Sequence, residues 1–143
     1  MASRLNPYLS FDGNARQAME FYQSVLGGTL DVRTFGEFGA PDPGLNDKVM
    51  HSMLETPAGF TLMASDLPPN MQHQPGNNIT VSLSGEDGDD LRGYWEQLSA
   101  EGTVMMPLEK QMWGDEFGMC VDQFGVAWMV NIAGDQSQQG ADA

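Results

Sequence analysis

The fold of this chain is decided by residues 110–132, which read KQMWGDEFGMCVDQFGVAWMVNI. Two apolar runs in this stretch, residues 117–121 and 126–132, flank the tetrapeptide DQFG. An aspartate at such a site can bond its own downstream backbone, and a glycine can adopt positive φ, so the spacing predicts a β-hairpin. The second run is almost continuously apolar, which indicates a strand covered on both faces, one of them by a helix.

An earlier stretch, residues 51–65 (HSMLETPAGFTLMAS), repeats the pattern of this hairpin. Aligning the glycines of the two turns pairs Gly59 with Gly125, Met53 with Met119, His51 with Phe117, Met63 with Met129 and Ser65 with Asn131. The helices before the hairpins end alike, because Phe21 lies seven residues before Gly28 and Trp95 lies seven residues before Gly102. The chain is therefore expected to contain two βαβββ halves.

The first half is expected to begin with a strand at residues 7–11 and a helix at residues 15–26, whose apolar side chains recur every three or four positions. Asp12 or Asn14 is expected to cap that helix. The other expected elements are strands at 29–35, 48–55, 60–65, 78–83 and 103–106, a helix at 91–100 and the last hairpin.

The domain organisation follows from these elements. We expect an α+β fold with a first βαβββ module at residues 1–66, a linker at 67–77, a second βαβββ module at 78–133 and a flexible tail at 134–143. The two curved sheets are expected to pair around a cleft.

Two polar segments admit alternative interpretations. Residues 36–47 are rich in Gly, Pro, Asp and Asn and predict a surface loop, which is either a lid or a tolerated insertion. Four acidic residues precede or begin the second helix, and the unpaired amides at a helix N-terminus account for them without a metal ion. These residues are Glu86, Asp87, Asp89 and Asp90.

The composition excludes several classes of partner and site. With 6 Lys and Arg against 20 Asp and Glu, the formal charge is −14, which repels phosphate backbones and anionic membrane surfaces. We therefore expect no nucleic-acid partner and no membrane partner. The single cysteine, Cys120, lies in an apolar run without a nearby cation, so we interpret it as a core residue and expect a cytoplasmic protein. No signal peptide or membrane span is visible.

Taken together, three groups of residues resemble the vicinal oxygen chelate superfamily, which includes glyoxalase I, fosfomycin-resistance proteins and extradiol dioxygenases, and in particular its PhnB-like branch. The groups are YLSFDGNA at 8–15, EFY at 20–22 with LGG at 26–28, and WG at 113–114 through FG, DQFG and WMVN up to 131. The resemblance spans the chain to about Ile132, with Gln123 where the branch usually has proline. It implies the glyoxalase/bleomycin-resistance fold and a homodimer.

Metal-using members of this superfamily place four His or Glu ligands in the cleft, one on the first and one on the fourth strand of each module. The resemblance sets these positions at Pro7, Met63, Asn78 and Met129, with an error of about one residue for Pro7 and Asn78. Proline and methionine do not bind hard divalent cations. We therefore expect a metal-free protein without a cofactor.

The candidate ligand-binding residues combine polar anchors with an apolar wall. The anchors are Ser10, His51 and Asn131, and the wall is Met63, Trp113 and Met129. His51 admits three interpretations: a core or wall histidine, a polar group in the cleft, or a metal ligand. The methionines are either gap-filling core residues or a soft wall for an apolar or aromatic ligand.

Three functions remain open on the sequence. The first, which we favour, is a PhnB-like, metal-free protein that binds a small organic molecule in its cleft. The second is a metal-independent enzyme in which His51 or Glu55 acts as a base. The third is a metal-dependent lyase or dioxygenase of the superfamily. A methyltransferase lacks support, because no strand is followed by a Gly-rich turn and an acidic residue suited to a nucleoside cofactor.

Overall fold

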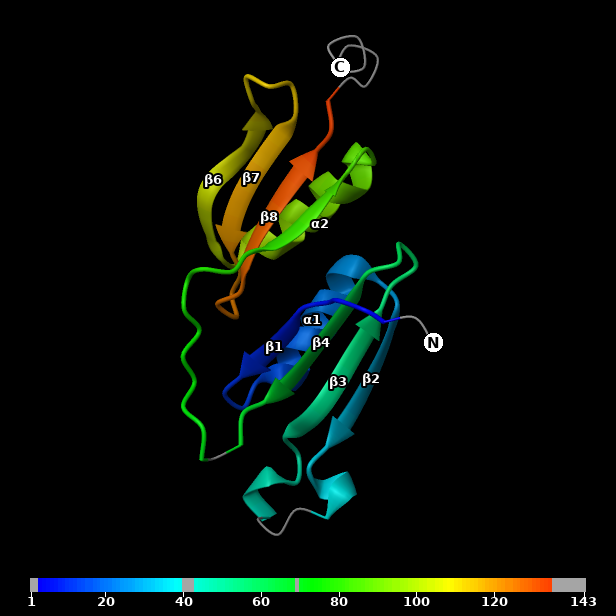
Figure 1. Ribbon diagram of the computed structural model, residues 1–143, viewed down its shortest axis with the longest axis vertical. Helices are drawn as coiled ribbons and strands as arrows, with labels where there is room; N and C mark the ends of the chain where they lie inside the picture. The colour runs from blue at the N-terminus through cyan, green and yellow to red at the C-terminus, as the bar shows by residue number, and fades with distance from the viewer. Residues whose placement is uncertain (1–2, 40–42, 69, 135–143) are drawn as a thin grey trace. The chain divides into compact units, whose positions relative to one another are not determined.

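The computed structural model describes residues 3–39, 43–68 and 70–134, and the chain divides into two compact units, Met1–Gln74 and Pro75–Ala143. Each unit has one long helix and four strands (Figure 1). The first contains β1 (Tyr8–Phe11), α1 (Ala15–Leu26), β2 (Thr29–Thr34), β3 (Val49–Glu55) and β4 (Thr61–Asp66). The second contains β5 (Val81–Gly85), α2 (Gly88–Ala100), β6 (Thr103–Lys110), β7 (Glu116–Val121) and β8 (Ala127–Ile132). The predicted α+β fold with two βαβββ modules is confirmed.

The first unit is a sheet of order β1-β4-β3-β2, in which β1 runs parallel to β4 and the other neighbours are antiparallel. The predicted helix bounds and buried face are confirmed, and the alternate strand residues on the side of α1 are buried with it. The buried apolar side chains are Ala15, Ala18, Met19, Tyr22, Val25 and Leu26 of α1, with Phe11, Val49, Leu54, Leu62 and Ala64 of the sheet.

The predicted cap of α1 is right in position but wrong in its side-chain bond. Asn14 is the N-cap residue, but its side chain makes no capping hydrogen bond. Instead Asp66, at the end of β4, accepts hydrogen bonds from the backbone N–H groups of Gly13 and Ala15 at one oxygen and of Val49 at the other, each at 2.9 Å. A residue 51 positions away thus satisfies the start of the helix, because parallel pairing brings the ends of β1 and β4 together.

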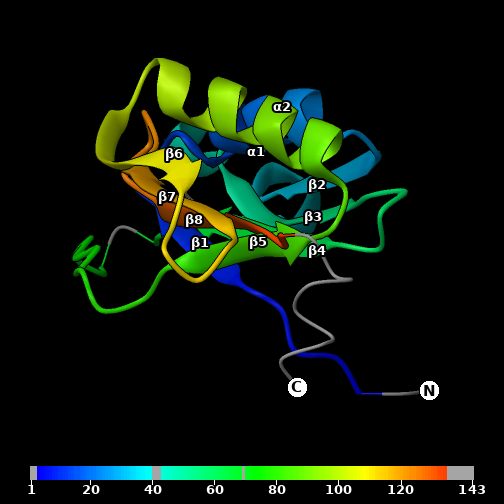
Figure 2. The ribbon, with the colours of Figure 1, turned by 90° about the horizontal axis from the view of Figure 1, so that it is seen from above.

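The second unit repeats this architecture with the order β5-β8-β7-β6, and α2 lies along one face of the sheet (Figure 2). Its helix begins three residues earlier than predicted, since Asp87 caps it by accepting a hydrogen bond from the Asp90 amide at 3.5 Å. Strand β5 begins at Val81 rather than residue 78, because its parallel pairing with β8 starts at Val81 and Trp128. Strand β6 extends to Lys110, four residues beyond the prediction, through two irregularities in its pairing with β7.

The predicted internal repeat is confirmed by equivalent close contacts in the two units. A Cβ on Gly28 would lie 2.1 Å from the carbonyl oxygen of Glu55, and one on Gly102 would lie 2.2 Å from that of Val121. Glycine is therefore required at positions 28 and 102, where the chain leaves each helix in close contact with the backbone of the hairpin. The second hairpin turn is further held by the buried Asp122, whose carboxylate accepts three hydrogen bonds.

The remaining segments differ in part from expectation. The loop at 36–47 has two short 3-10 turns, Gly36–Phe38 and Pro43–Leu45, while residues 40–42 lie outside the described part of the chain. Of the predicted tail, only Gly134 is described, and 135–143 lie outside it. Within the described ranges, no helix is long and apolar enough to cross a membrane.

Candidate functional site

The face of the first sheet opposite α1, here called the first open face, carries three of the predicted site residues. Strand residues alternate between the two faces, and Tyr8, Ser10, His51, Met53, Met63 and Ser65 all occupy the alternate positions to the buried core residues. Ser10, His51 and Met63 are therefore brought together on one surface within the first unit. None of these six side chains is buried.

A tyrosine–histidine pair occupies this open face. The Tyr8 hydroxyl lies 3.3 Å from Nδ1 of His51, and the two ring centroids are 5.9 Å apart with a 32° angle between the planes. Either group can donate in this hydrogen bond, depending on the imidazole tautomer. The other ring nitrogen, Nε2, has no partner among the described residues. The pair thus leaves one imidazole nitrogen for an external group.

Sequence reasoning missed Tyr8, although its register could have revealed it. Strand β1 pairs with β4 so that Tyr8 lies opposite Met63, and β3 pairs with β4 so that Met53 lies opposite Met63. The two methionines are cross-strand neighbours beside the tyrosine. Thioether side chains are polarizable and make favourable contacts with aromatic rings, so they provide an adaptable apolar floor next to the polar pair.

The second unit has a corresponding second open face, with two of the other predicted residues. Met119 lies opposite Met129, and Phe117 lies opposite Asn131. The Asn131 side-chain amide donates to Asp115 at 3.0 Å, and Asp115 also accepts from the Gly134 backbone at 2.9 Å. The sequence did not predict this carboxylate, which orients the asparagine.

Trp113 belongs to the turn between β6 and β7, at the edge of the second open face. Its side chain is 56% exposed, and its ring centroid lies 6.3 Å from that of Phe117 with a 59° angle between the planes. This separation is within the range of favourable aromatic pairs. The structure therefore places Trp113, Met129 and Asn131 on or beside the same surface of the second unit.

The residues at the family's ligand positions do not fit a hard divalent metal ion. In the first sheet, Tyr8 of β1 pairs with Met63 of β4. In the second sheet, Ser82 of β5 pairs with Met129 of β8. Asn78 lies before β5, which starts at Val81, and the residue that pairs with Met129 is Ser82. A tyrosine, a serine and two thioethers lack the imidazole and carboxylate donors that such metals prefer. In the described part of the chain, no three His, Cys, Asp or Glu residues form a group that could hold a metal.

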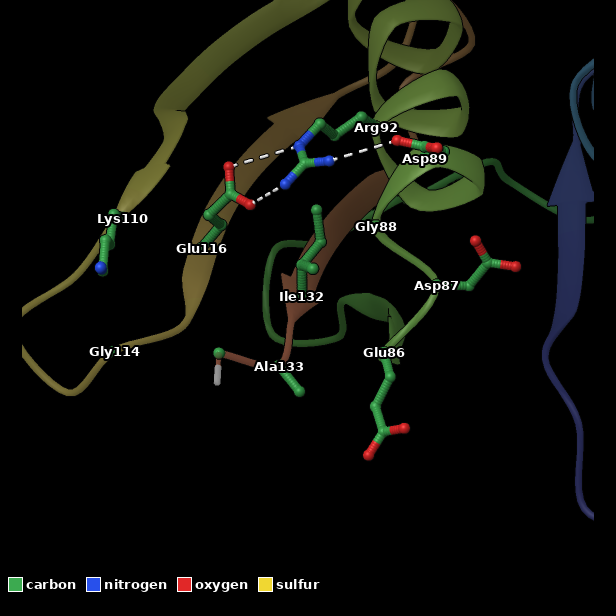
Figure 3. A pocket seen from close by; sticks show the side chains of 11 residues that line it. Glu86, Asp87, Gly88, Asp89, Arg92, Lys110, Gly114, Glu116, Ile132 and Ala133 are labelled. Atoms are coloured by element: carbon green, nitrogen blue, oxygen red, sulfur yellow. Dashed lines mark hydrogen bonds and ion pairs between the residues drawn. The ribbon is translucent and has the colours of Figure 1, made fainter. Parts of the chain in front are cut away.

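A charged hollow of about 570 Å³ lies within the second unit, where β5 and β8 end and α2 begins (Figure 3). Arg92 lies between Glu116, which it contacts through two guanidinium nitrogens, and Asp89, whose carboxylate is 3.6 Å away. Hydrogen bonding and the charge of Glu116 raise the pKa of Arg92. The arginine charge is thus balanced by the hollow's own acidic residues.

One of the acidic residues beside this hollow, Asp87, serves the helix as the sequence predicted. Asp87 caps α2, and the hydrogen bond to Asp87, followed by the repulsion of its charge, raises the pKa of Asp90. Negative side chains at a helix N-terminus are stabilised by its unpaired amides. The hollow is therefore explained by capping and ion pairing.

Cys120 is the buried core residue that the sequence indicated. It is 1% exposed, and burial, followed by the charge of Asp122, raises the pKa of its thiol to about 11. A thiol that stays protonated at neutral pH is a poor nucleophile.

Comparison with known proteins agrees with this architecture. The sequence model of the Glyoxalase/Bleomycin resistance protein/Dioxygenase superfamily matches residues 4–130. Protein YjdN of Escherichia coli is 31% identical over 147 residues, which cover 94% of this chain and 99% of YjdN. The crystal structure of PA1353 from Pseudomonas aeruginosa has 37% identity and a TM-score of 0.84, covering 94% of this chain and 100% of that one. The PhnB protein of Bacillus cereus shares the fold at 22% identity, with a TM-score of 0.71 over 92% of this chain and 100% of that one.

Proposed function

The chain belongs to the Glyoxalase/Bleomycin resistance protein/Dioxygenase superfamily, and on that premise we propose that it is a metal-free protein that binds a small organic molecule on the first open face. The observation that carries the proposal is the Tyr8–His51 pair beside the paired methionines Met53 and Met63. This surface combines a hydrogen-bonding group with an apolar floor, as ligand sites commonly do.

The polar part of the proposed site is preorganised. Its histidine ring is held by the tyrosine hydroxyl at 3.3 Å and the neighbouring ring, so binding a ligand through Nε2 costs little further ordering. Two serine hydroxyls, those of Ser10 and Ser65, lie opposite each other on β1 and β4 and add donors and acceptors. The ligand therefore carries at least one polar group.

The proposal of a metal-free protein rests on donor chemistry. The paired positions in the two sheets carry Tyr8 with Met63 and Ser82 with Met129. Bound metal at about one ion per chain in the purified protein, with a melting temperature that falls when EDTA is added, would contradict it.

A second candidate function is metal-independent acid–base catalysis. The hydrogen bond between Tyr8 and His51 favours it, because an imidazole held in a fixed orientation can act as a general acid or base. Glu55, the other base suggested by the sequence, instead lies 3.7 Å from Arg4 in an exposed ion pair. Turnover that is lost in His51→Gln while binding persists would favour this candidate over simple binding.

The experiment is a fragment screen read by NMR of methyl-labelled methionines. Monocyclic aromatic fragments with one polar group are expected to shift the Met53 and Met63 methyl signals and leave that of the fully buried Met19 unchanged. His51→Ala is expected to weaken binding about two- to tenfold, the range for loss of one hydrogen bond. His73→Ala, which changes the chain's other histidine, is the matched control. Equal affinity in His51→Ala and His73→Ala would remove His51 from the site.

We also propose that the protein is a homodimer, as its resemblance to the family implies. Gel filtration with light scattering at the mass of one chain, 15.6 kDa, would contradict it.

A further inference from the structure

We propose that the second open face recognises a planar aromatic ring bearing a hydrogen-bond donor, through Trp113, Phe117 and Asn131. This inference rests on the proposed function for the ligand being a small organic molecule. It adds a second binding surface, in the second unit, and the chemical class of ligand which that surface takes. The supporting observations are the contacts of the turn between β6 and β7 with the neighbouring sheet.

The turn that bears the tryptophan is fixed by its own backbone. The Gln111 amide donates to the Asp115 carbonyl at 2.7 Å, and the Gly114 amide donates to the Gln111 carbonyl at 3.0 Å. Gly114 has φ of +102°, which glycine adopts without strain. The indole is therefore presented from an ordered turn, and ring binding does not require ordering of the loop.

The turn contacts the sheet at two neighbouring residues. The Trp113 ring lies beside that of Phe117, while the Asp115 carboxylate accepts from the amide of Asn131. Phe117 and Asn131 are themselves opposite each other on β7 and β8. The two aromatic rings and the amide thus belong to one patch. Met112, the neighbour of Trp113, is 97% exposed and contributes almost nothing to it.

The asparagine side chain is oriented as an acceptor. Because a carboxylate can only accept, the Asn131 group that faces Asp115 is the NH₂. Within the described ranges, no group donates to the other side-chain atom, the Asn131 carbonyl oxygen. The Ser84 hydroxyl lies opposite Asn131 on β5. A ligand at this point is therefore expected to donate a hydrogen bond.

The charge around the patch selects against an anionic ligand. Asp115 holds Asn131, and Glu109 lies opposite Phe117 on β6. A carboxylate on the ligand would meet both negative charges, whereas a neutral phenolic hydroxyl or ring N–H would not. The corresponding row of the first sheet differs, because His51 and Arg33 stand opposite each other there.

The test uses three naphthalenes that differ in one group. 2-Naphthol has the donor, 2-methoxynaphthalene lacks it, and 2-naphthoate replaces it with an anion. Titrations are followed by the indole N–H signals of the uniformly labelled protein, with the Trp113 signal identified by its absence in Trp113→Phe. 2-Naphthol is expected to shift this signal and to leave that of Trp128, which is buried and bonded to Asp122 at 2.8 Å, unchanged.

The variants separate the ring from the donor. Trp113→Ala is expected to weaken 2-naphthol binding about tenfold, near the upper end for an aromatic contact, and Met112→Ala less than about twofold. Asn131→Leu is expected to remove the preference for 2-naphthol over 2-methoxynaphthalene, which is about two- to tenfold in the parent. Circular dichroism confirms that each variant is folded.

Several results would overturn the inference. They are an unmoved Trp113 signal at the solubility limit of 2-naphthol, equal affinities in Trp113→Ala and Met112→Ala, and binding of 2-methoxynaphthalene or 2-naphthoate as tight as that of 2-naphthol. If fragments shift the Met53 and Met63 methyl groups and depend on His51 while Trp113→Ala is silent, the proposed function stands and this inference fails.

Discussion

Removing the Asp66 carboxylate is predicted to destabilise the first unit far more than removing the side chain of Asp12 or Asn14, which directly precede α1 in the sequence. Asp66 is 3% exposed and accepts hydrogen bonds from Gly13, Ala15 and Val49, each at 2.9 Å. Asp66→Ala leaves these three N–H groups without their acceptor, and each hydrogen bond to a charged group is worth about 1.5–3 kcal/mol. Because the three losses are not additive, we expect a total of about 3–5 kcal/mol.

Two further substitutions make this prediction specific. Asp66→Asn can keep one oxygen for Gly13 and Ala15 but turns an NH₂ toward the Val49 N–H, so we expect about 2 kcal/mol. Asp12→Ala changes an exposed side chain at one of the two positions predicted as cap from the sequence, and the free energy of unfolding is expected to change by less than about 0.5 kcal/mol.

The assay is urea unfolding followed by circular dichroism at 222 nm, with amide exchange of α1 as a local measure. Tryptophan fluorescence alone is unsuitable, because Trp95, Trp113 and Trp128 all lie in the second unit. A loss below about 1 kcal/mol in Asp66→Ala, or an equal loss in Asp12→Ala, would refute the reasoning.

Two other predictions concern the core of the second unit. Gly102→Ala is expected to lower the free energy of unfolding by more than about 2 kcal/mol, because its Cβ would lie 2.2 Å from the Val121 carbonyl oxygen. Gly93→Ala, whose Cβ would have no atom within 4 Å, should raise it by up to about 1 kcal/mol through helix propensity. Urea unfolding midpoints measure both, and similar values for the two variants would contradict the packing argument. The native state raises the pKa of Cys120 from 9.0 to about 11, so it binds the thiol proton more tightly than the unfolded chain does, and stability should fall as pH rises from 9 to 11. At about 1.4 kcal/mol per pKa unit, the loss of stability is at most about 3 kcal/mol. In thermal melts between pH 9 and 11, the stability of Cys120→Ala should therefore fall less steeply with pH than that of the parent. An identical pH dependence in both proteins would contradict this prediction.

Most of the fold was predictable because its signals are local or periodic. The bounds of α1 follow from apolar residues at helical spacing and the two glycines after Leu26, and the structure reproduces them. The repeat was predictable because hairpin turns and helix ends are each marked by glycine. The errors at β5, β6 and α2 lie at element ends, where pairing with β8 and β7 and capping by Asp87 decide the bounds.

The candidate site was predictable only in part. Side-chain parity along β3, β4 and β8 placed His51, Met63 and Asn131 on strand faces correctly, because alternation is a local property of a strand. The partners of these residues were not predictable. Tyr8 reaches His51 from 43 positions away, and Asp115 reaches Asn131 from 16 positions away.

The sequence by itself determined the two βαβββ units, the buried face of α1 and the family, because these depend on periodicity, turn chemistry and motif spacing. Only the tertiary structure decided that Asp66 caps α1, that Tyr8 holds His51 and that Asp115 orients Asn131. The physical reason is that strand register sets these contacts. Parallel pairing of β1 with β4 and antiparallel pairing of β7 with β8 bring together residues whose order along the chain carries no sign of their proximity.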